Sequence, residues 1–205
     1  TYQDTVGHGL GAVPKMIIVK GTSFSREWTV YHVGMGNNKN MHLDKNEAPA
    51  TEPSWGNTTP TSSVFTISGS AEANWYDTNK PSETYIAYCF AEKQGFSKIG
   101  TYTGNGNANG PFIYTGFKPA FVMIKKSSGT SQWYIWDNKR NTSNPGSGAL
   151  FPDLNNAEET DAYVDFFSNG FKIQETSSDF NESGATYIYM AFAEAPFVNS
   201  KGVPC

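Results

Sequence analysis

Two versions of one short stretch decide the fold of this chain. Residues 11–20 read Gly-Ala-Val-Pro-Lys-Met-Ile-Ile-Val-Lys, and residues 116–125 read Gly-Phe-Lys-Pro-Ala-Phe-Val-Met-Ile-Lys. The first glycine, the proline and the last lysine recur 105 positions later without a gap. In both versions a proline precedes a short apolar run, which is typical of a buried strand that begins where a missing N–H does least harm. Such a recurrence indicates an internal duplication.

The correspondence extends along both copies. Residues 28–31 (Trp-Thr-Val-Tyr) correspond at the same spacing to residues 133–136 (Trp-Tyr-Ile-Trp). Residues 84–92 and 186–194 both begin with Thr-Tyr-Ile and end with Phe-Ala-Glu, 102 positions apart. The spacing changes within the variable middle, where loops differ in length. The sequence therefore predicts two tandem homologous repeats, residues 1–94 and 95–205, whose short link favours close packing of the two.

Each repeat is predicted to consist of β-strands. Its opening apolar run and the following aromatic run flank a turn-rich stretch, so they form a predicted β-hairpin. The closing runs at residues 85–90 and 187–192 are almost entirely apolar and are predicted to be central strands. Residues 163–167 and 170–173 flank Asn169, and the Asn-Gly step there is a strong hairpin signal.

The remaining stretches fit the same architecture. Residues 63–67 alternate with period two and predict a half-exposed strand, whereas residues 44–61 and 138–160 are rich in turn-forming residues and predict long loops. Only residues 155–161 suggest a helix, of one or two turns. The predicted fold class is all-β, an antiparallel β-sandwich built from two tandem homologous repeats.

The first repeat lacks a counterpart to one strand of the second. Residues 97–104 form a predicted strand ahead of the turn at residues 105–110, but Thr1 already corresponds to Gly106. An unpaired sheet edge is a liability. We therefore expect this opening strand to come from chain that precedes Thr1 or from another chain.

Composition argues against several classes of protein. The formal net charge is −4, only 17% of residues are charged, and the chain has no basic run that would neutralise phosphates, so nucleic acid is not an expected partner. No window approaches the ~18 apolar residues of a membrane span. Of the two cysteines, Cys89 is interpreted as a small buried hydrophobe, with a Cys89–Cys205 disulfide as the alternative.

No catalytic constellation is evident in the sequence. The histidines, His8, His32 and His42, have no second His or Cys at metal-ligand spacing. The acidic residues between 153 and 161 are interpreted as a solvated loop rather than a calcium site, because the spacing of an EF-hand is missing. No nucleophile-elbow, phosphate-loop or zinc-protease motif occurs. We therefore predict no enzymatic activity, no metal and no cofactor.

Aromatic residues outside the repeated strands are the best candidates for ligand binding. Trp55, Trp75 and Tyr76 lie in polar, turn-rich stretches, and Asp77 follows directly. A ring beside Asn or Asp suits a sugar, which needs an apolar surface for its ring and polar groups for its hydroxyls. The alternative is that these rings fold back over the sandwich. We therefore interpret these four residues as a candidate glycan site.

Nearly the whole chain resembles a repeat domain found in the virion proteins of tailed bacteriophages of marine and cyanobacterial type. The resemblance rests on residues 85–92, 95–106 and 110–122, and on the ending at residues 193–197 and 202–205. It implies a structural particle component, such as a tail fibre, a head fibre or a capsid decoration, located on the surface of the extracellular virion. It carries no catalytic residues to this chain.

Expected partners follow from this resemblance. They are other virion proteins, further copies of the chain, and a host-surface glycan bound through exposed loops. Further copies are expected because fibres are usually cyclic trimers. The main alternative is a free carbohydrate-binding lectin, in which tandem repeats would add avidity. A third possibility is a glycan-degrading enzyme.

Overall fold

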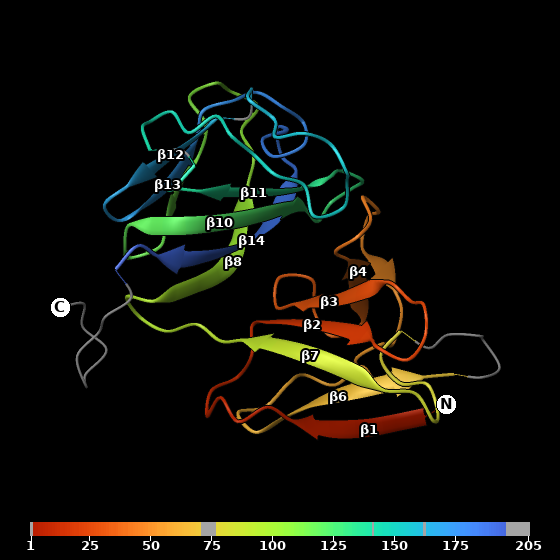
Figure 1. The fold of residues 1–205 in the computed structure, drawn as a ribbon. Helices are drawn as coiled ribbons and strands as arrows, with labels where there is room; N and C mark the ends of the chain where they lie inside the picture. The colour runs from red at the N-terminus through yellow and green to blue at the C-terminus, as the bar shows by residue number, and fades with distance from the viewer. Residues whose placement is uncertain (1, 71–76, 141, 162, 196–205) are drawn as a thin grey trace. The chain divides into compact units, whose positions relative to one another are not determined.

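The computed structural model describes residues 2–70, 77–140, 142–161 and 163–195 of the 205-residue chain (Figure 1). These ranges form 14 β-strands and no helix. The strands are β1 (Tyr2–Gly7), β2 (Met16–Gly21), β3 (Trp28–His32), β4 (Lys39–His42), β5 (Ala50–Thr51), β6 (Val64–Gly69), β7 (Tyr85–Phe90), β8 (Ser97–Thr103), β9 (Phe112–Tyr114), β10 (Pro119–Lys126), β11 (Trp133–Asp137), β12 (Val164–Phe167), β13 (Gly170–Ile173) and β14 (Thr186–Ala193). The all-β prediction is confirmed.

The helical turns predicted at residues 155–161 are wrong. Glu159 instead exchanges two backbone hydrogen bonds with Ala149, with N–O distances of 2.8 and 2.9 Å. Such a reciprocal pair requires locally extended backbone. A long-range bridge has therefore overridden a weak local preference for helix.

The chain divides into two compact units, Thr1–Ala91 and Glu92–Cys205. This boundary lies three residues before the one predicted from the sequence. We call these ranges the first and the second unit, and each is described by itself.

In the first unit, a five-stranded antiparallel sheet in the order β5-β4-β3-β2-β7 accompanies a two-stranded sheet of β1 and β6. The buried cluster of this unit draws side chains from both sheets. It contains Ile17 and Val19 of β2, Tyr31 of β3, Phe65 of β6 and Trp55 from the preceding loop. Apolar side chains on the facing sides of the two sheets thus form the core, as in a sandwich.

In the second unit, a four-stranded sheet in the order β11-β10-β14-β8 is accompanied by a three-stranded sheet in the order β12-β13-β9. Figure 1 shows β12 and β13 as a layer beside β10 and β11. Side chains of both sheets meet in one buried cluster, which includes Val122, Trp136, Tyr187, Val164 and Phe171.

Strands at repeated positions have the same neighbours in both units. β2 lies between β3 and β7, and β10 lies between β11 and β14. The turns match as well, because the N–H groups of Thr22 and Ser127 donate to the carbonyls of Thr84 and Thr186, each at 2.8 Å. β1 pairs with β6 as β9 pairs with β13. In the first unit, β1 therefore occupies the place that β9 has in the second.

The closing strands differ in their position in the sheet. β14 is a central strand, as predicted, because β8 pairs with its second side. β7 is at the edge of the sheet formed by the described residues, so the prediction that residues 85–90 form a central strand is wrong there. The apolar composition of the two strands is alike, and only the presence of a neighbouring strand separates them.

Gly170 offers a test of the packing in the second unit. A Cβ atom at this position would lie 2.2 Å from the Ile113 carbonyl oxygen on the paired strand β9. Gly170→Ala should therefore force β13 away from β9 and lower the free energy of unfolding by about 2 kcal/mol, as overpacking does. Denaturant unfolding would measure the change. Gly129→Ala is the control, since its nearest heavy atom is a Lys126 side-chain carbon at 3.5 Å; equal stability of the two variants would contradict the packing described here.

Candidate functional site

Trp55, one of the four residues predicted to bind a glycan, is a core residue. Its side chain is only 1% exposed, and its ring lies edge-on to Tyr31 with a centroid distance of 5.6 Å. The loop that carries it is pinned to β6, because the Ser68 N–H donates to the Ser54 carbonyl at 2.9 Å. An indole so enclosed presents no face to a ligand. Its ring folds back into the sandwich, which was the alternative left open by the sequence.

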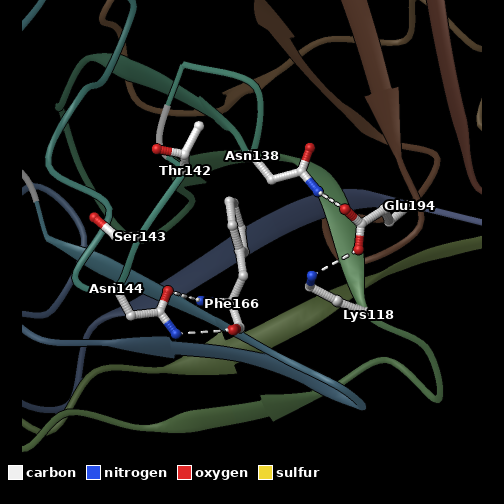
Figure 2. A pocket seen from close by; sticks show the side chains of 7 residues that line it. All are labelled: Lys118, Asn138, Thr142, Ser143, Asn144, Phe166 and Glu194. Carbon is white, nitrogen blue, oxygen red and sulfur yellow. Dashed lines mark hydrogen bonds and ion pairs between the residues drawn. The ribbon is translucent and has the colours of Figure 1, made fainter.

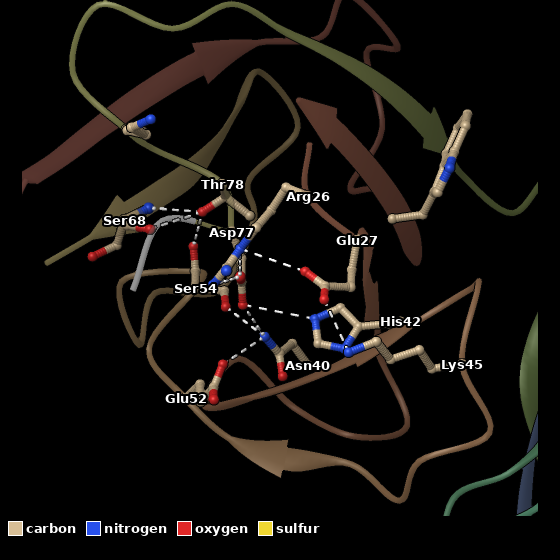
Figure 3. Close-up of polar contacts among 12 residues, drawn as sticks. Arg26, Glu27, Asn40, His42, Lys45, Glu52, Ser54, Ser68, Asp77 and Thr78 are labelled. Carbon is tan, nitrogen blue, oxygen red and sulfur yellow. Dashed lines mark hydrogen bonds and ion pairs between the residues drawn. The ribbon is translucent and has the colours of Figure 1, made fainter. Parts of the chain in front are cut away.

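Trp75 and Tyr76 lie outside the described residues, and Asp77 is the first residue described after them. Asp77 is buried, with 2% of its surface exposed, and it is the centre of a polar cluster (Figure 3). Its Oδ1 accepts from Arg26 Nε at 2.8 Å and pairs with Nη2 at 2.7 Å. Its Oδ2 accepts from Asn40 Nδ2 at 3.1 Å and lies 3.7 Å from His42 Nε2.

The charges in this cluster compensate one another. Burial raises the pKa of Asp77, but His42 and Arg26 outweigh it and bring that pKa from 3.8 to about 2. Burial lowers the pKa of His42, but the nearby carboxylates of Asp77 and Glu47 leave it raised. Asp77 is therefore a carboxylate whose partners are all supplied by the protein.

The second unit repeats this arrangement with other residues. Asp179 stands 102 positions after Asp77, and its Oδ1 accepts from Ser131 Oγ at 3.1 Å, the residue that corresponds to Arg26 at the 105 spacing. Its Oδ2 accepts from Tyr134 Oη at 2.8 Å. In both units, an aspartate before the closing strand, buried in the first unit and partly buried in the second, binds the turn of the opening hairpin. We therefore assign Asp77 to holding the fold together rather than to contacting a ligand.

The low pKa of Asp77 predicts how stability depends on pH. A carboxylate whose pKa is depressed on folding contributes stability above its unfolded pKa, and this contribution is lost as the pH falls through the folded pKa. The first unit should therefore lose about 2 kcal/mol between roughly pH 4 and pH 2 through this group. Urea unfolding from pH 2 to pH 6 would measure the loss, and Asp77→Asn should remove it from the profile. An unchanged profile in that variant would contradict this account.

The better candidate for ligand binding is a hollow in the second unit (Figure 2). Its volume is about 210 Å³, and it is lined by Lys118, Asn138, Thr142, Ser143, Asn144, Phe166 and Glu194. Lys118 stands just before β10 and Glu194 just after β14, and the loop after β11 supplies Asn138, Thr142, Ser143 and Asn144. Phe166 comes from β12, so the hollow joins a strand of the three-stranded sheet to residues that flank the strands of the four-stranded sheet.

Hydrogen bonds hold the walls of this hollow in place. The Asn144 side chain accepts from the Phe166 N–H at 3.0 Å and donates to the Phe166 carbonyl at 2.9 Å, which ties the loop to β12. Opposite, Glu194 pairs with Lys118 Nζ at 2.7 Å and accepts from Asn138 Nδ2 at 2.8 Å. The lysine lowers the pKa of Glu194, which therefore stays ionised. The walls are thus preformed, with hydroxyl groups of Thr142 and Ser143 beside them.

The chemistry of this hollow suits a small neutral polar ligand. It combines one aromatic ring with amide, hydroxyl, ammonium and carboxylate groups, and binding sites pair an apolar surface with a few placed polar groups. Its volume is below the roughly 300–1,000 Å³ of sites for drug-sized ligands. A second hollow of about 440 Å³ is lined by Tyr114, a residue that is 65% exposed, together with Lys93 and Lys98. The β9–β10 connection, residues 115–118, contributes to both.

Sequence reasoning did not find this hollow. Asn138, Ser143 and Asn144 fell within residues 138–160, which were interpreted as a surface loop, and Lys118 was interpreted only as part of the repeated stretch. A signal was nevertheless present, because Lys118 and Asn138 correspond at the 105 spacing to Val13 and Val33. A polar pair in one copy replaces an apolar pair in the other, which marks a position where the two units differ in chemistry rather than in core packing.

Other predicted features have clear places in the structure. Cys89 on β7 is half-buried and unpaired in the described part of the chain, and burial raises the pKa of its thiol; Cys205 lies outside that part. Within the described ranges, no three His, Cys, Asp or Glu side chains gather as metal ligands would. No helix in those ranges has the length and apolar character needed to cross a membrane.

Comparison with known proteins places the sequence in a family without a described role. The sequence profile of a family described as a domain of unknown function, DUF7483, matches residues 1–196, which is nearly the whole chain. No curated protein matches the chain significantly. No solved structure does so either.

Proposed function

We propose that this chain, which belongs to the DUF7483 family, is a structural component of a phage particle that binds a surface glycan through its second unit. The particle role rests on the resemblance of its repeats to virion proteins. It would be a tail fibre, a head fibre or a capsid decoration, exposed on the extracellular virion and assembled from several copies of the chain.

One observation carries the proposal of glycan binding. The hollow places the small exposed part of Phe166, a core residue that is 7% exposed, within a set of hydrogen-bonding side chains, and these side chains are held in position by one another. Preorganised polar groups spare the ligand the cost of ordering them. Sugars present both an apolar ring face and hydroxyl groups, so a single sugar residue suits the character of this site.

The exposed Tyr114 supports a longer ligand. Its ring lines the larger hollow, and the connection between β9 and β10 contributes to both hollows. A glycan chain with one residue at Phe166 would extend toward Tyr114, where a ring face is available for stacking. The burial of Trp55 and Asp77 thus favours the second unit as the candidate site, whereas Trp75 and Tyr76, which lie outside the described residues, stay a prediction.

Binding can be tested by making the second unit resemble the first. Lys118→Val together with Asn138→Val copies Val13 and Val33, and we expect roughly tenfold weaker glycan affinity from the lost polar contacts, with an unchanged melting temperature. A glycan array would first identify a bound sugar, and calorimetry would then compare the variants. Val13→Ser with Val33→Ser is the matched control in the first unit and should leave affinity unchanged. Equal affinity of the Lys118/Asn138 variant and the unchanged protein would exclude this hollow as the site.

The particle role needs a separate measurement. Quantitative mass spectrometry of purified particles should find the chain at a stoichiometric copy number, in a multiple that reflects its oligomeric state. Glycan binding by a chain that is absent from particles would instead support a free lectin. Release of reducing sugar from a bound glycan would contradict the expectation of a non-enzymatic protein.

A further inference from the structure

The two units differ at one sheet edge in a way that points to a missing partner. In the second unit, β8 pairs antiparallel with β14 over seven positions, from Ser97 opposite Phe192 to Thr103 opposite Thr186. β7 has the corresponding place in the first unit, but no described strand pairs with its second side. Among the described residues, the same position in the fold is thus covered by a strand in the second unit and by none in the first.

The backbone of β7 is oriented to accept such a strand. Lys15 N–H donates to the Phe90 carbonyl, and Thr22 N–H donates to the Thr84 carbonyl. The backbone N–H and C=O groups of the even-numbered residues of β7 therefore point toward β2. Alternate residues of an antiparallel strand direct their N–H and C=O groups to opposite sides. Ala87 and Cys89 therefore direct theirs toward the open edge.

The sequence of β7 lacks two features by which proteins protect a sheet edge. Its sequence, Tyr-Ile-Ala-Tyr-Cys-Phe, contains no charge and no proline, either of which would discourage pairing. Ile86 and Tyr88 are 42% and 43% exposed. Apolar surface beside an open backbone edge is the combination that strand addition requires, because the backbone supplies affinity and the side chains supply specificity.

We propose that the open edge of β7 binds an extended strand of the β8 type, which completes the first unit as β8 completes the second. The register of β8 on β14 defines the occupant. Tyr102 of β8 stacks on Tyr187 with a centroid distance of 4.9 Å, and Tyr85 stands 102 positions before Tyr187. The incoming strand therefore places an aromatic residue against Tyr85 and runs antiparallel to β7.

The β7 edge should prefer a bulkier strand than β8. A Cβ atom on Gly100 of β8 would lie 3.1 Å from the hydroxyl of Tyr189, which leaves little space for a side chain. In the first unit, Ala87 stands where Tyr189 stands in the second. The smaller alanine leaves space for a β-branched residue in the incoming strand, and that residue would add buried apolar surface.

Peptides test this proposal on the full chain. A labelled peptide with the sequence of residues 95–104 should bind, and the same peptide carrying Gly100→Val should bind roughly tenfold more tightly by fluorescence anisotropy. Ala87→Tyr in the protein should reverse the preference, since it recreates Tyr189. This reversal would also exclude the alternative that the peptide displaces β8 and pairs with β14. Tyr189 of β14 leaves little space for a side chain at position 100, so β14 would reject the Gly100→Val peptide.

Backbone methylation provides a control that does not depend on the folding of a variant. Gly100 and Tyr102 of β8 lie opposite Tyr189 and Tyr187 of β14, and the N–H of residue 102 points toward the partner strand. N-methylation at position 102 of the peptide should therefore abolish binding. N-methylation at position 101, whose N–H faces the opposite side, should leave binding intact. Equal binding of the two methylated peptides would overturn the proposal. So would self-association of the chain through β7 without uptake of peptide, because a second copy would then be the occupant.

Discussion

Replacing Trp55 with alanine is expected to lower the free energy of unfolding of the first unit by about 3–5 kcal/mol. The indole is enclosed by Ile17, Val19, Tyr31 and Phe65, which come from both sheets, so no single element can move to fill the space. A cavity that cannot collapse costs more than the lost transfer free energy alone. Denaturant unfolding, followed by hydrogen exchange in β2 and β3, would measure the loss and show which unit carries it.

The same variant distinguishes the two interpretations of Trp55. If the indole only packs in the core, glycan binding by the second unit survives Trp55→Ala at temperatures where the chain remains folded. Trp55→Phe is the control, because it keeps much of the apolar volume and should cost less than half as much. Loss of glycan binding with an unchanged melting temperature would restore Trp55 as a ligand-binding residue and contradict its placement in the core.

Asp77→Ala is expected to destabilise the first unit by about 3 kcal/mol. Removing one partner of a buried ion pair leaves the others without compensation, which is why breaking such a pair costs more than the pair contributes. Here Arg26 keeps some contact with solvent, with 31% of its side chain exposed, whereas Asn40 is fully buried and loses an acceptor. The cost should therefore fall at the lower end of the range for buried pairs.

Urea unfolding at neutral pH would measure this effect, with Glu47→Gln as the matched control. Glu47 also approaches His42, at 3.4 Å, but its side chain is 52% exposed, and exposed pairs contribute about 0–1 kcal/mol. A combined Asp77→Ala and Arg26→Ala variant should be less destabilised than the sum of the two single changes, because the two side chains share one interaction. Strict additivity would show that Asp77 and Arg26 act independently.

Sequence patterns identified the strands wherever the strand was long and apolar. The runs that became β2, β7, β10 and β14 combine β-branched and aromatic residues, whose side chains pack well on a pleated sheet, and the Asn-Gly step marked the turn between β12 and β13. Four strands, β1, β4, β5 and β9, were not predicted. Their sequences are polar or only two or three residues long, and they form because a neighbouring strand offers hydrogen-bond partners.

The candidate sites show a different limit of sequence reasoning. Trp55 has polar, turn-forming neighbours, which suggested exposure, yet a loop pinned to β6 directs its ring inward. Asp77 was selected as a companion of a sugar-binding ring, but Arg26 and Asn40 reach it from distant loops and strands. In both cases, the direction of a side chain depends on contacts remote in sequence, which local composition does not encode.

The sequence by itself determined the all-β class and predicted the duplication, because strand periodicity and a constant spacing are properties of the chain alone. The tertiary structure decided which closing strand is central, which aromatic rings are buried and where a ligand can fit. Phe166, Asn144 and Glu194 come from separate strands and loops, and only the packing of two sheets brings them around one hollow. The physical reason is that periodicity records how a strand pairs locally, whereas a binding site requires side chains distant in sequence to converge in space.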